Sequence, residues 1–488
     1  MNIYNIIENI AQNKAKNIAY IYEGVSSTYD ELILQTSRFA NELMNRNIKK
    51  NDKVAVLLGN SPEFIHAYLA VLKLGAIVVP LNPAFTESEL NYIINDSGVK
   101  LVVSTADHKQ KLLNVKESSP LCEDLMFVDE EIQQIHSNLV ERTIFNEEDV
   151  AIILYTSGTT GNPKGAVLTH YNLIENAKDF SSMIELHETD RMIAVLPMFH
   201  SFCLTICVNM ILLNGATTII IPKFNPIELV EIIKKEKATL IAAVPTIYNY
   251  LNQLNNVTAE DFSSLRVCIS GGASIPIELL NSLQDKYKLV ILEGYGLSET
   301  APVLTFNPYR GICKPGSVGI DLPSVETKIF NEIGEEVTVG EVGEVVAKGP
   351  NVLKRYFNKI EETEKAFING WFKTGDLGKK DDEGYLYLLD RKKDVIITNG
   401  YNVYPREIEE RLYEHPNIIE AAVVGKPDLL NGESVCAYLV VNNDVNEEEI
   451  IHFCKKDLIH YKVPKYIYFV NELPKNSTGK ILKRNLVN

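Results

Sequence analysis

Two segments far apart in the chain contain the residue types that could hold a triphosphate. The first, Thr156–Gly165 (TSGTTGNPKG), combines hydroxyls, small turn-forming positions and a cation. The second, Pro474–Ile481 (PKNSTGKI), places the cation of Lys480 on a short turn. Glycines accept positive φ and let backbone N–H groups turn toward an anion. The two segments together indicate a site for a nucleoside triphosphate.

The P-loop of strand–helix nucleotide triphosphatases is the nearest alternative for the first segment, and the sequence excludes it. A P-loop needs Gly-Lys followed by Ser or Thr at the start of a helix. The Gly-Lys pairs at Gly378, Gly425 and Gly479 are followed by Lys, Pro and Ile. For the loop alone an ordinary Gly/Thr-rich hairpin stays open, because Thr-Gly and Asn-Pro are common turn dipeptides. With Lys480 beside it, we expect an enzyme that uses ATP to activate an acid.

The composition excludes some classes of partner. The formal net charge of −16 and the lack of a long basic run argue against a nucleic-acid surface. The longest apolar stretch, Phe202–Leu213, is too short to span a bilayer, and the N-terminus resembles an amphipathic helix more than a signal peptide. We therefore expect no transmembrane segment and no nucleic-acid partner.

The cysteine pattern favours a reduced, cytoplasmic protein. The number is odd, no Cys-x-x-Cys pair occurs, and most of the cysteines lie in apolar stretches. Cys203 and Cys207 are one helical turn apart with His200 close by, but no second pair at zinc spacing completes a metal site. The cysteines are Cys122, Cys203, Cys207, Cys268, Cys313, Cys436 and Cys454.

Up to about residue 330, short apolar runs alternate with segments of helical period. For example, a strand at Val54–Leu58 precedes a helix at Pro62–Leu74 and a second strand at Ala76–Pro80. This rhythm predicts an α/β fold, with mostly parallel sheets covered by helices. We expect further strands at Leu101–Ser104, Met192–Leu196, Thr217–Ile221, Leu240–Val244, Val267–Ile269 and Leu289–Leu292.

The pattern changes after Gly316 to short alternating segments with Gly turns, such as Glu344–Ala347 and Tyr385–Leu388. They predict an antiparallel, β-rich subdomain. The charged stretch Arg391–Asp394 then precedes mixed helix and strand, and we place a domain boundary there. The prediction is a large N-terminal domain at 1–390 and a small α+β domain at 394–488.

With these pieces assembled, the whole chain resembles the acyl-adenylate-forming superfamily of acyl-CoA synthetases, aryl-CoA ligases, firefly luciferase and peptide-synthetase adenylation domains. The resemblance depends on an ordered set of motifs, and it is strongest to the fatty-acyl-CoA synthetases. The motifs are Thr156–Gly165, Gly271–Ala273, Gly294–Thr300, Gly370–Asp376, Asp390–Asp394 with Gly400 and Pro405–Glu409, and Lys480.

The resemblance implies an ATP site with Mg²⁺. Glu299 would hold the metal, which prefers carboxylate, phosphate and water oxygens, and Thr300 would contact the α-phosphate. Tyr295 would stack on adenine, Asp376 would accept the ribose hydroxyls, and Arg391 would contact ribose or phosphate. The remaining nucleotide candidates are Thr156, Ser157, Gly158, Thr159, Thr160 and Lys164 around the phosphates, and Gly272, Ala273, Glu293, Gly294 and Gly296 around the base.

Taken singly, these residues also have simpler interpretations. Glu299 could be a surface glutamate at a helix end, Tyr295 a core tyrosine, Asp376 an Asx-turn residue and Lys480 a solvated lysine near the chain end. Only the set as a whole favours the nucleotide site.

The resemblance also implies two half-reactions. Lys480 would bridge the carboxylate of the acid and the α-phosphate in the first. A hinge at 391–393, with Lys393 as its pivot, would then withdraw Lys480 and bring Asn399, Gly400 and Tyr401 to the site, where the thiol of CoA attacks. Many members have Gly-Gly where this chain has Asn399-Gly400, but fatty-acid and coumarate ligases also have a single Gly.

His200 follows Phe199 at the position where amino-acid-activating relatives have an Asp, so we expect an acid without an α-ammonium. His200 would orient the carboxylate or gate the channel; a structural histidine is the alternative.

A medium- or long-chain fatty acid is favoured, and an aryl acid (coumarate, benzoate or O-succinylbenzoate) is the closest alternative. CoA is the expected acceptor, an acyl carrier protein is the second, and the protein is expected to be a monomer or homodimer. The pocket candidates are His200, Phe202, Val244, Pro245, Gly272, Leu297, Ala301 and Val303.

Overall fold

The computed structural model of the chain describes residues 2–131, 146–156, 163–428, 430–443 and 445–487. Within these ranges the strands form four sheets: two large sheets of the α/β region, an antiparallel sheet, and the sheet of the C-terminal region. No helix in the same ranges is both long and apolar enough to cross a membrane. The predicted α/β fold is confirmed, including the change to antiparallel pairing after residue 316.

The first large sheet has a parallel centre, from β1 through β10, β9, β11 and β12 to β13. Its edge strands pair in the antiparallel direction. In spatial order its strands are β15 (Ile320–Asp321), β14 (Val303–Phe306), β13 (Ile291–Gly296), β12 (Val267–Ser270), β11 (Leu240–Ala243), β9 (Arg191–Ala194), β10 (Thr217–Ile220), β1 (Ile18–Tyr22) and β2 (Val25–Thr28).

The second large sheet is parallel from β7 through β4, β3 and β5 to β6, and its other edge is antiparallel. In spatial order its strands are β18 (Arg355–Tyr356), β8 (Lys164–Thr169), β7 (Val150–Thr156), β4 (Ile77–Pro80), β3 (Lys53–Leu57), β5 (Val99–Ser104) and β6 (Asp124–Phe127).

Strand β3 shows how this sheet is buried on both faces. Successive side chains of a strand point to opposite faces. Val54 and Val56 join the large core that the two sheets share, whereas Ala55 and Leu57 join a second core with residues of α4 and α5. Burial on both faces explains why the strands appear in the sequence as continuous apolar runs.

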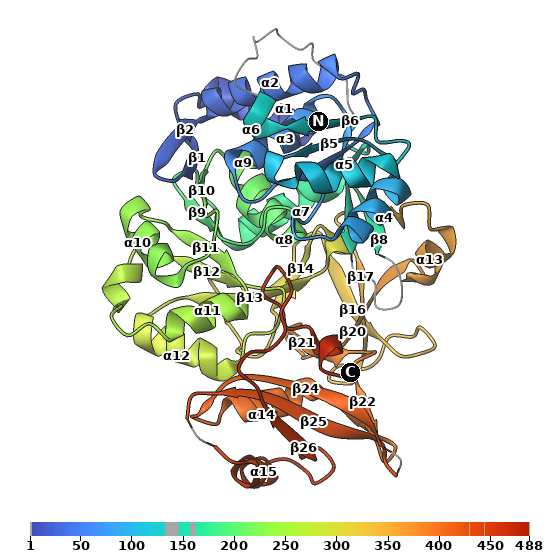
Figure 1. The fold of residues 1–488 in the computed structure, drawn as a ribbon. Coiled ribbons are helices and arrows are strands. Elements are labelled where there is room, and N and C mark those ends of the chain that lie inside the picture. Colours follow the sequence, from blue (N-terminus) through green and yellow to red (C-terminus); the bar gives the residue numbers. More distant parts are fainter. Residues whose placement is uncertain (1, 132–145, 157–162, 429, 444, 488) are drawn as a thin grey trace.

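Helices fill the space between and around the two sheets (Figure 1). Helices α1, α2, α3, α7 and α9 contribute to the shared core, and α10, α11 and α12 lie beside β11 and β12. The helices of this region are α1 (Ile3–Asn13), α2 (Tyr29–Asn45), α3 (Pro62–Lys73), α4 (Glu87–Ser97), α5 (Lys109–Glu117), α6 (Val128–Glu131), α7 (His170–Met183), α8 (Ser201–Cys203), the π-helix η3 (Leu204–Asn209), α9 (Met210–Leu213), α10 (Pro226–Glu236), α11 (Pro245–Asn252), α12 (Ile277–Tyr287) and α13 (Ile360–Lys365). Short 3₁₀ turns are η1 (Ala106–His108), η4 (Ala259–Phe262) and η5 (Ser298–Thr300).

The antiparallel sheet connects the α/β region to the C-terminal region. Its last strand pairs with β20 so that Arg391 lies opposite Asp376. Its strands are β16 (Glu326–Phe330), β17 (Gly343–Lys348), β19 (Phe367–Ile368), β20 (Trp371–Lys380) and β21 (Leu386–Arg391).

The C-terminal region has its own sheet and its own hydrophobic cores. It lies at the bottom of Figure 1, and the dark-red segment that contains Lys480 rises from it toward β13. The elements are β22 (Ile396–Thr398), β23 (Tyr401–Val403), α14 (Pro405–Tyr413), β24 (Ile418–Asp428), β25 (Gly432–Val441), α15 (Glu447–Lys455), β26 (Tyr466–Phe469) and the 3₁₀ turn η6 (Lys483–Asn485). The chain passes between the two sheets at residues 392–395, and the domain boundary at 390 stays a prediction.

Candidate active site

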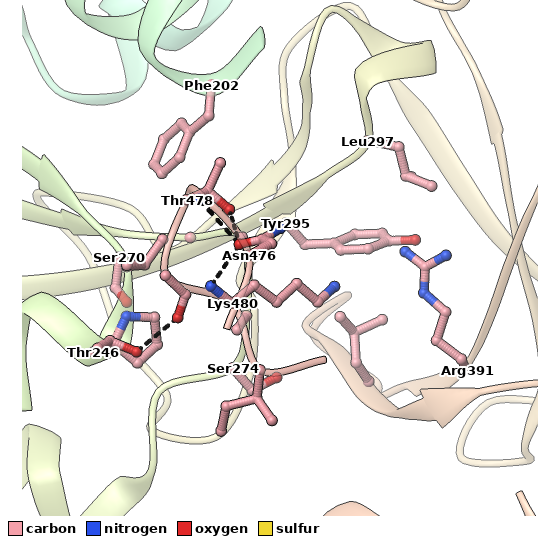
Figure 2. A pocket seen from close by; sticks show the side chains of 18 of the residues that line it. Phe202, Thr246, Ser270, Ser274, Tyr295, Leu297, Arg391, Asn476, Thr478 and Lys480 are labelled. Atoms are coloured by element: carbon pink, nitrogen blue, oxygen red, sulfur yellow. Dashed lines mark hydrogen bonds between the residues drawn. The ribbon is translucent and has the colours of Figure 1, made fainter. Parts of the chain in front are cut away.

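A cavity of about 1750 Å³ lies between the α/β region and the C-terminal region. The segments that follow β9, β11 and β12 border it, together with β13, β20 and the turn that contains Lys480 (Figure 2). Loops at the carboxyl ends of parallel strands are the usual place for a ligand site in such sheets. The cavity therefore lies where the topology predicts one.

One end of the cavity is built from Tyr295, Asp376 and Arg391. The Tyr295 hydroxyl donates to Asp376 Oδ2 at 2.5 Å, and Arg391 Nε lies 2.8 Å from Asp376 Oδ1. Burial raises the pKa of Asp376, and the Arg391 charge and the Tyr295 hydrogen bond act in the opposite direction. Each carboxylate oxygen retains a further acceptor position. The carboxylate is thus held in place and can still accept hydroxyl groups of a ligand.

Position 296 must be a glycine for a steric reason. A Cβ at this position would lie 1.7 Å from the carbonyl oxygen of Pro302. Strand β13 therefore bends closely past residue 302, which brings Gly294, Tyr295 and Gly296 to the cavity wall with Gly272 and Ala273.

Glu293 is the buried acid of this wall. Its Oε1 accepts the Ile275 N–H at 3.2 Å, and its Oε2 has no partner in the described part of the chain. Burial raises the pKa of Glu293 from 4.5 to about 7, a rise that Arg406 opposes and Glu410 favours. Both charged groups come from α14 of the C-terminal region.

A second cluster surrounds Glu299, at the loop between β7 and β8. The hydroxyls of Thr156 and Tyr356 donate to Glu299 Oε1 at 3.2 and 3.1 Å. Thr156 pairs with Lys164 across the hairpin, and Lys164 Nζ lies 5.5 Å from the centre of the Tyr356 ring. The predicted phosphate-binding residues Ser157, Gly158, Thr159 and Thr160 lie outside the described residues.

The residues around Glu299 fit Mg²⁺ when the metal comes with a phosphate ligand. No group of three or more His, Cys, Asp or Glu side chains that could hold a metal occurs among the described residues. Magnesium is commonly held by one or two carboxylates together with substrate phosphates and water. The carboxylate of Glu299 and the hydroxyl of Thr156 supply oxygen ligands of this kind.

Thr300 is placed apart from the other catalytic candidates. Its hydroxyl donates to the carbonyl of Pro302 at 2.6 Å and accepts the Leu297 N–H at 3.0 Å, and the side chain is fully buried. Neither Thr300 nor Ala301 lines the cavity. The Thr300 hydroxyl thus shapes the turn beneath Glu299, and its contact with a phosphate stays a prediction.

Lys480 enters the cavity from the C-terminal region. Its side chain extends toward the side of the cavity where Tyr295 and Arg391 lie (Figure 2). The protein around Lys480 lowers its pKa, chiefly by desolvation and secondarily through the charge of Arg391, while Asp376 raises it. The lysine is therefore close to the Tyr295–Asp376–Arg391 group.

His200 also lines the cavity, close enough to Lys480 to feel its charge. Burial lowers its pKa to about 4, and the charge of Lys480 adds to the effect, so the ring is neutral at pH 7. Its Nδ1 accepts the Phe202 N–H at 3.3 Å, which caps α8. A neutral ring that accepts at Nδ1 has its proton on Nε2. His200 can thus donate one hydrogen bond to a carboxylate near Lys480.

The candidate acyl pocket is largely apolar. Phe202, Val244, Leu297 and Val303 line the cavity together with Gly272. The ring of Phe202 fills the space beside Gly271, because a Cβ there would lie 3.1 Å from Phe202 Cζ. Further apolar lining comes from Phe180, Ile269, Phe306 and Val318.

The predicted thiol-access residues lie outside the cavity. Asn399 and Gly400 form the two-residue turn between β22 and β23, with φ of +51° and +80°. Asn-Gly is the preferred pair for such a turn. Tyr401 is exposed and stacks on Tyr461 with ring centres 4.5 Å apart, whereas Lys393 lines the cavity. In this conformation Lys480 lies in the cavity and the β22–β23 turn lies outside it.

Besides the further apolar lining residues, the sequence analysis missed Tyr356 and Thr246. Tyr356, on the short strand β18, connects Lys164 and Glu299. Thr246, in the first turn of α11, contacts the turn that contains Lys480. Neither belongs to a motif, and the only sequence signal was Pro245, which marks the helix start just before Thr246.

Comparison with known proteins identifies the family. The model of the AMP-binding enzyme family matches residues 7–357, and that of the AMP-binding enzyme C-terminal domain matches residues 407–480. The chain belongs to the AMP-binding enzyme family. It is 37% identical to a long-chain-fatty-acid–CoA ligase of Bacillus subtilis, over 99% of this chain and 94% of the relative.

Solved structures agree over the whole length. The ATP-bound MatB of Rhodopseudomonas palustris has a TM-score of 0.94 and 33% identity, covering 100% of this chain and 98% of that one. The o-succinylbenzoate CoA synthetase of Bacillus subtilis, in complex with its acyl-adenylate intermediate, has a TM-score of 0.90 and 33% identity, covering 99% and 98%. That synthetase has also been solved with ATP and a magnesium ion. These matches confirm the predicted superfamily, the fold and the class of enzyme, an AMP-forming acid–thiol ligase.

Proposed function

We propose that this protein activates a medium- or long-chain fatty acid as its acyl-adenylate and then transfers the acyl group to CoA. The observation that carries the proposal is the position of Lys480. It reaches the same cavity as the Tyr295–Asp376–Arg391 group, beside a neutral His200 and an apolar pocket. Binding alone would need no cation between these two ends.

In the first half-reaction an oxygen of the carboxylate attacks the α-phosphorus of ATP. A new O–P bond forms, the bond from the α-phosphorus to the bridging oxygen breaks, and pyrophosphate leaves with the electron pair. Lys480 neutralises the two anions as they meet, and His200 Nε2–H orients the carboxylate. Mg²⁺ held at Glu299 and Thr156 would neutralise phosphate charge.

In the second half-reaction the thiol sulfur of CoA attacks the acyl carbonyl carbon. The C–S bond forms, the C–O bond to the phosphate breaks, AMP leaves with the electron pair, and the thiol proton is released to solvent. In the proposed mechanism Lys480 withdraws by rotation at 391–393, and the small Gly400 leaves room for the pantetheine arm. Exposure of the β22–β23 turn outside the cavity is consistent with such a second conformation.

The proposal also names the acid and the acceptor. The apolar lining and the B. subtilis long-chain-fatty-acid–CoA ligase favour a fatty acid. The likeness to the o-succinylbenzoate synthetase keeps an aryl acid as the second candidate. CoA is preferred to a carrier protein because relatives of both kinds are named as CoA ligases. The cytoplasmic location and the monomeric or dimeric state remain predictions.

The test is a pair of assays on the purified protein. Acid-dependent release of pyrophosphate from ATP measures adenylation, and thiol-dependent release of AMP measures transfer. We expect both with fatty acids, and AMP release should depend on CoA far more than on pantetheine-loaded carrier protein. Pyrophosphate release that no acid in a broad panel stimulates would contradict the proposed function.

A further inference from the structure

The turn that contains Lys480 is held together by its own residues. The side-chain oxygen of Asn476 accepts the Thr478 N–H at 3.0 Å, the Thr478 hydroxyl at 2.7 Å and the Lys480 N–H at 2.9 Å. Gly479 completes the turn with φ of +86°, a value that favours glycine. The shape of the turn is therefore set within the C-terminal region. Its position relative to the cavity needs contacts with the rest of the protein.

Two side chains of the α/β region supply these contacts. The Thr246 hydroxyl donates to the carbonyl of Gly479 at 2.9 Å (Figure 2). The side-chain amide of Asn82, just after β4, donates to the Ser477 hydroxyl at 2.9 Å. Both acceptors lie within three residues of Lys480, so these bonds fix the backbone from which the lysine extends.

The segment after β11 lies directly against the turn. A Cβ at Gly479 would be 3.2 Å from Cγ2 of Val244. Pro245 begins α11, so the next residue, Thr246, faces the turn from the first turn of a rigid helix. Thr246 is half-buried, whereas the Asn82–Ser477 bond is exposed to solvent. The Thr246 bond is thus the better protected of the two.

We propose that Thr246 is a positioning residue for the adenylation half-reaction, with Asn82 as a weaker second tether. The proposal rests on the proposed function for the reaction it serves. Both hydrogen bonds connect the two regions only while Lys480 is in the cavity, and both must break before the C-terminal region can rotate. Thr246 stabilises the conformation that forms the adenylate and has no part in the attack of the thiol.

The first test separates the two half-reactions. Thr246→Val keeps the shape of the side chain and removes the hydroxyl, and Thr246→Ser keeps the hydroxyl. A neutral hydrogen bond contributes roughly a fivefold change in an equilibrium. Thr246→Val should therefore lower the kcat of pyrophosphate release about fivefold and leave conversion of supplied acyl-adenylate to thioester unchanged or faster. Thr246→Ser should restore adenylation. Equal loss in both half-reactions, or no loss in either, overturns the proposal.

The second test needs no activity. The variant carries Asn82→Cys and Ser477→Cys, together with Cys313→Ser to remove the exposed native cysteine. A short bifunctional thiol reagent bridges the two new cysteines when Lys480 is in the cavity, so the rate of bridging reports that conformation. We expect Thr246→Val to slow bridging about fivefold and Thr246→Ser to leave its rate near that of the parent. Equal bridging rates in the Val and Thr proteins overturn the proposal. If bridging follows the expected order and no acid stimulates pyrophosphate release, the proposed function fails instead.

Discussion

The charge of Lys480 is needed at one moment of the proposed reaction, when an anionic carboxylate meets an anionic phosphate. Burial and the neighbouring Arg391 lower the pKa of Lys480, whereas Asp376 keeps a compensating charge close by. Burying such a cation costs free energy unless it pairs with the reacting groups. Its role should therefore be confined to adenylation.

Lys480→Ala should reduce pyrophosphate release by at least ~100-fold, the scale of one lost transition-state charge contact. Thioester formation from supplied acyl-adenylate should remain largely intact. Lys475→Ala is the matched control, since Lys475 belongs to the same segment but pairs with Glu420 at 2.8 Å. A similar loss in both half-reactions for Lys480→Ala would refute the assigned role.

Glu293 should make stability depend on pH. Burial raises its pKa to about 7, so between pH 4.5 and 7 the folded protein holds a proton that the unfolded chain releases. The stability that this proton contributes is present below pH 4.5 and is lost as pH rises through 7. Arg406 and Glu410, the charged groups of α14 that influence Glu293, act in opposite directions.

Glu293→Gln removes this titration, because glutamine is neutral throughout the range. Between pH 5 and pH 8, the Tm of the variant should rise by about 3 °C relative to that of the wild type. This value is the free energy of two pKa units divided by the entropy of unfolding of a chain of this size. Thermal unfolding at several pH values measures it, with Glu361→Gln at an exposed glutamate as the control. A constant Tm difference would show that Glu293 does not titrate in this window.

At the scale of single elements, the proposed second half-reaction depends on the β22–β23 hairpin and on the connection before it. The N–H groups of Lys392 and Asp394 donate to Gly375 and Arg391, both at 2.9 Å. A proline at position 393 removes neither of these two N–H donors and fixes φ. It should therefore hinder rotation.

Lys393→Pro should form adenylate at a rate near that of the wild type and fail to convert supplied adenylate to thioester. Lys393→Ala, which keeps a free φ, should do both. Single-turnover assays with isolated acyl-adenylate separate the steps. Thioester formation by the proline variant at the wild-type rate would mean that the pivot lies elsewhere.

Elements were more predictable than the contacts between them. Buried parallel strands such as β3 and β11 were visible as apolar runs, because both of their faces are covered. The position of β18 was not visible: two residues, Arg355 and Tyr356, pair with β8 through contacts distant in sequence and bring the Tyr356 hydroxyl to Glu299. Thr300 shows the reverse case. It belongs to a motif that is recognised in the sequence, but in the structure its hydroxyl donates to the carbonyl of Pro302 in the local turn.

At the scale of the whole molecule, the cavity joins a charged end and an apolar end, and Lys480 enters between them from the C-terminal region. The sequence named Tyr295, Asp376 and Arg391 of the charged end, because fixed chemistry requires fixed residue types, and their roles stay predictions. The apolar end depends on how Phe202, Val244 and the glycines after β12 pack together, and apolar side chains are interchangeable in that role. The acid is therefore the least constrained part of the proposal.

The apolar pocket should make activity increase with the chain length of the acid. Each methylene that fits contributes about 0.8 kcal/mol, roughly a fourfold gain in binding, until the channel is full. The kcat/KM for pyrophosphate release should thus rise over straight-chain acids and then level off or fall, and α-amino acids should be inactive because no Asp follows Phe199 to pair with an ammonium. The measurement covers acids from acetate to palmitate beside benzoate, coumarate and succinylbenzoate. A flat response to chain length with a clear aryl preference would eliminate the fatty-acid proposal and favour an aryl-CoA ligase built on the same cavity.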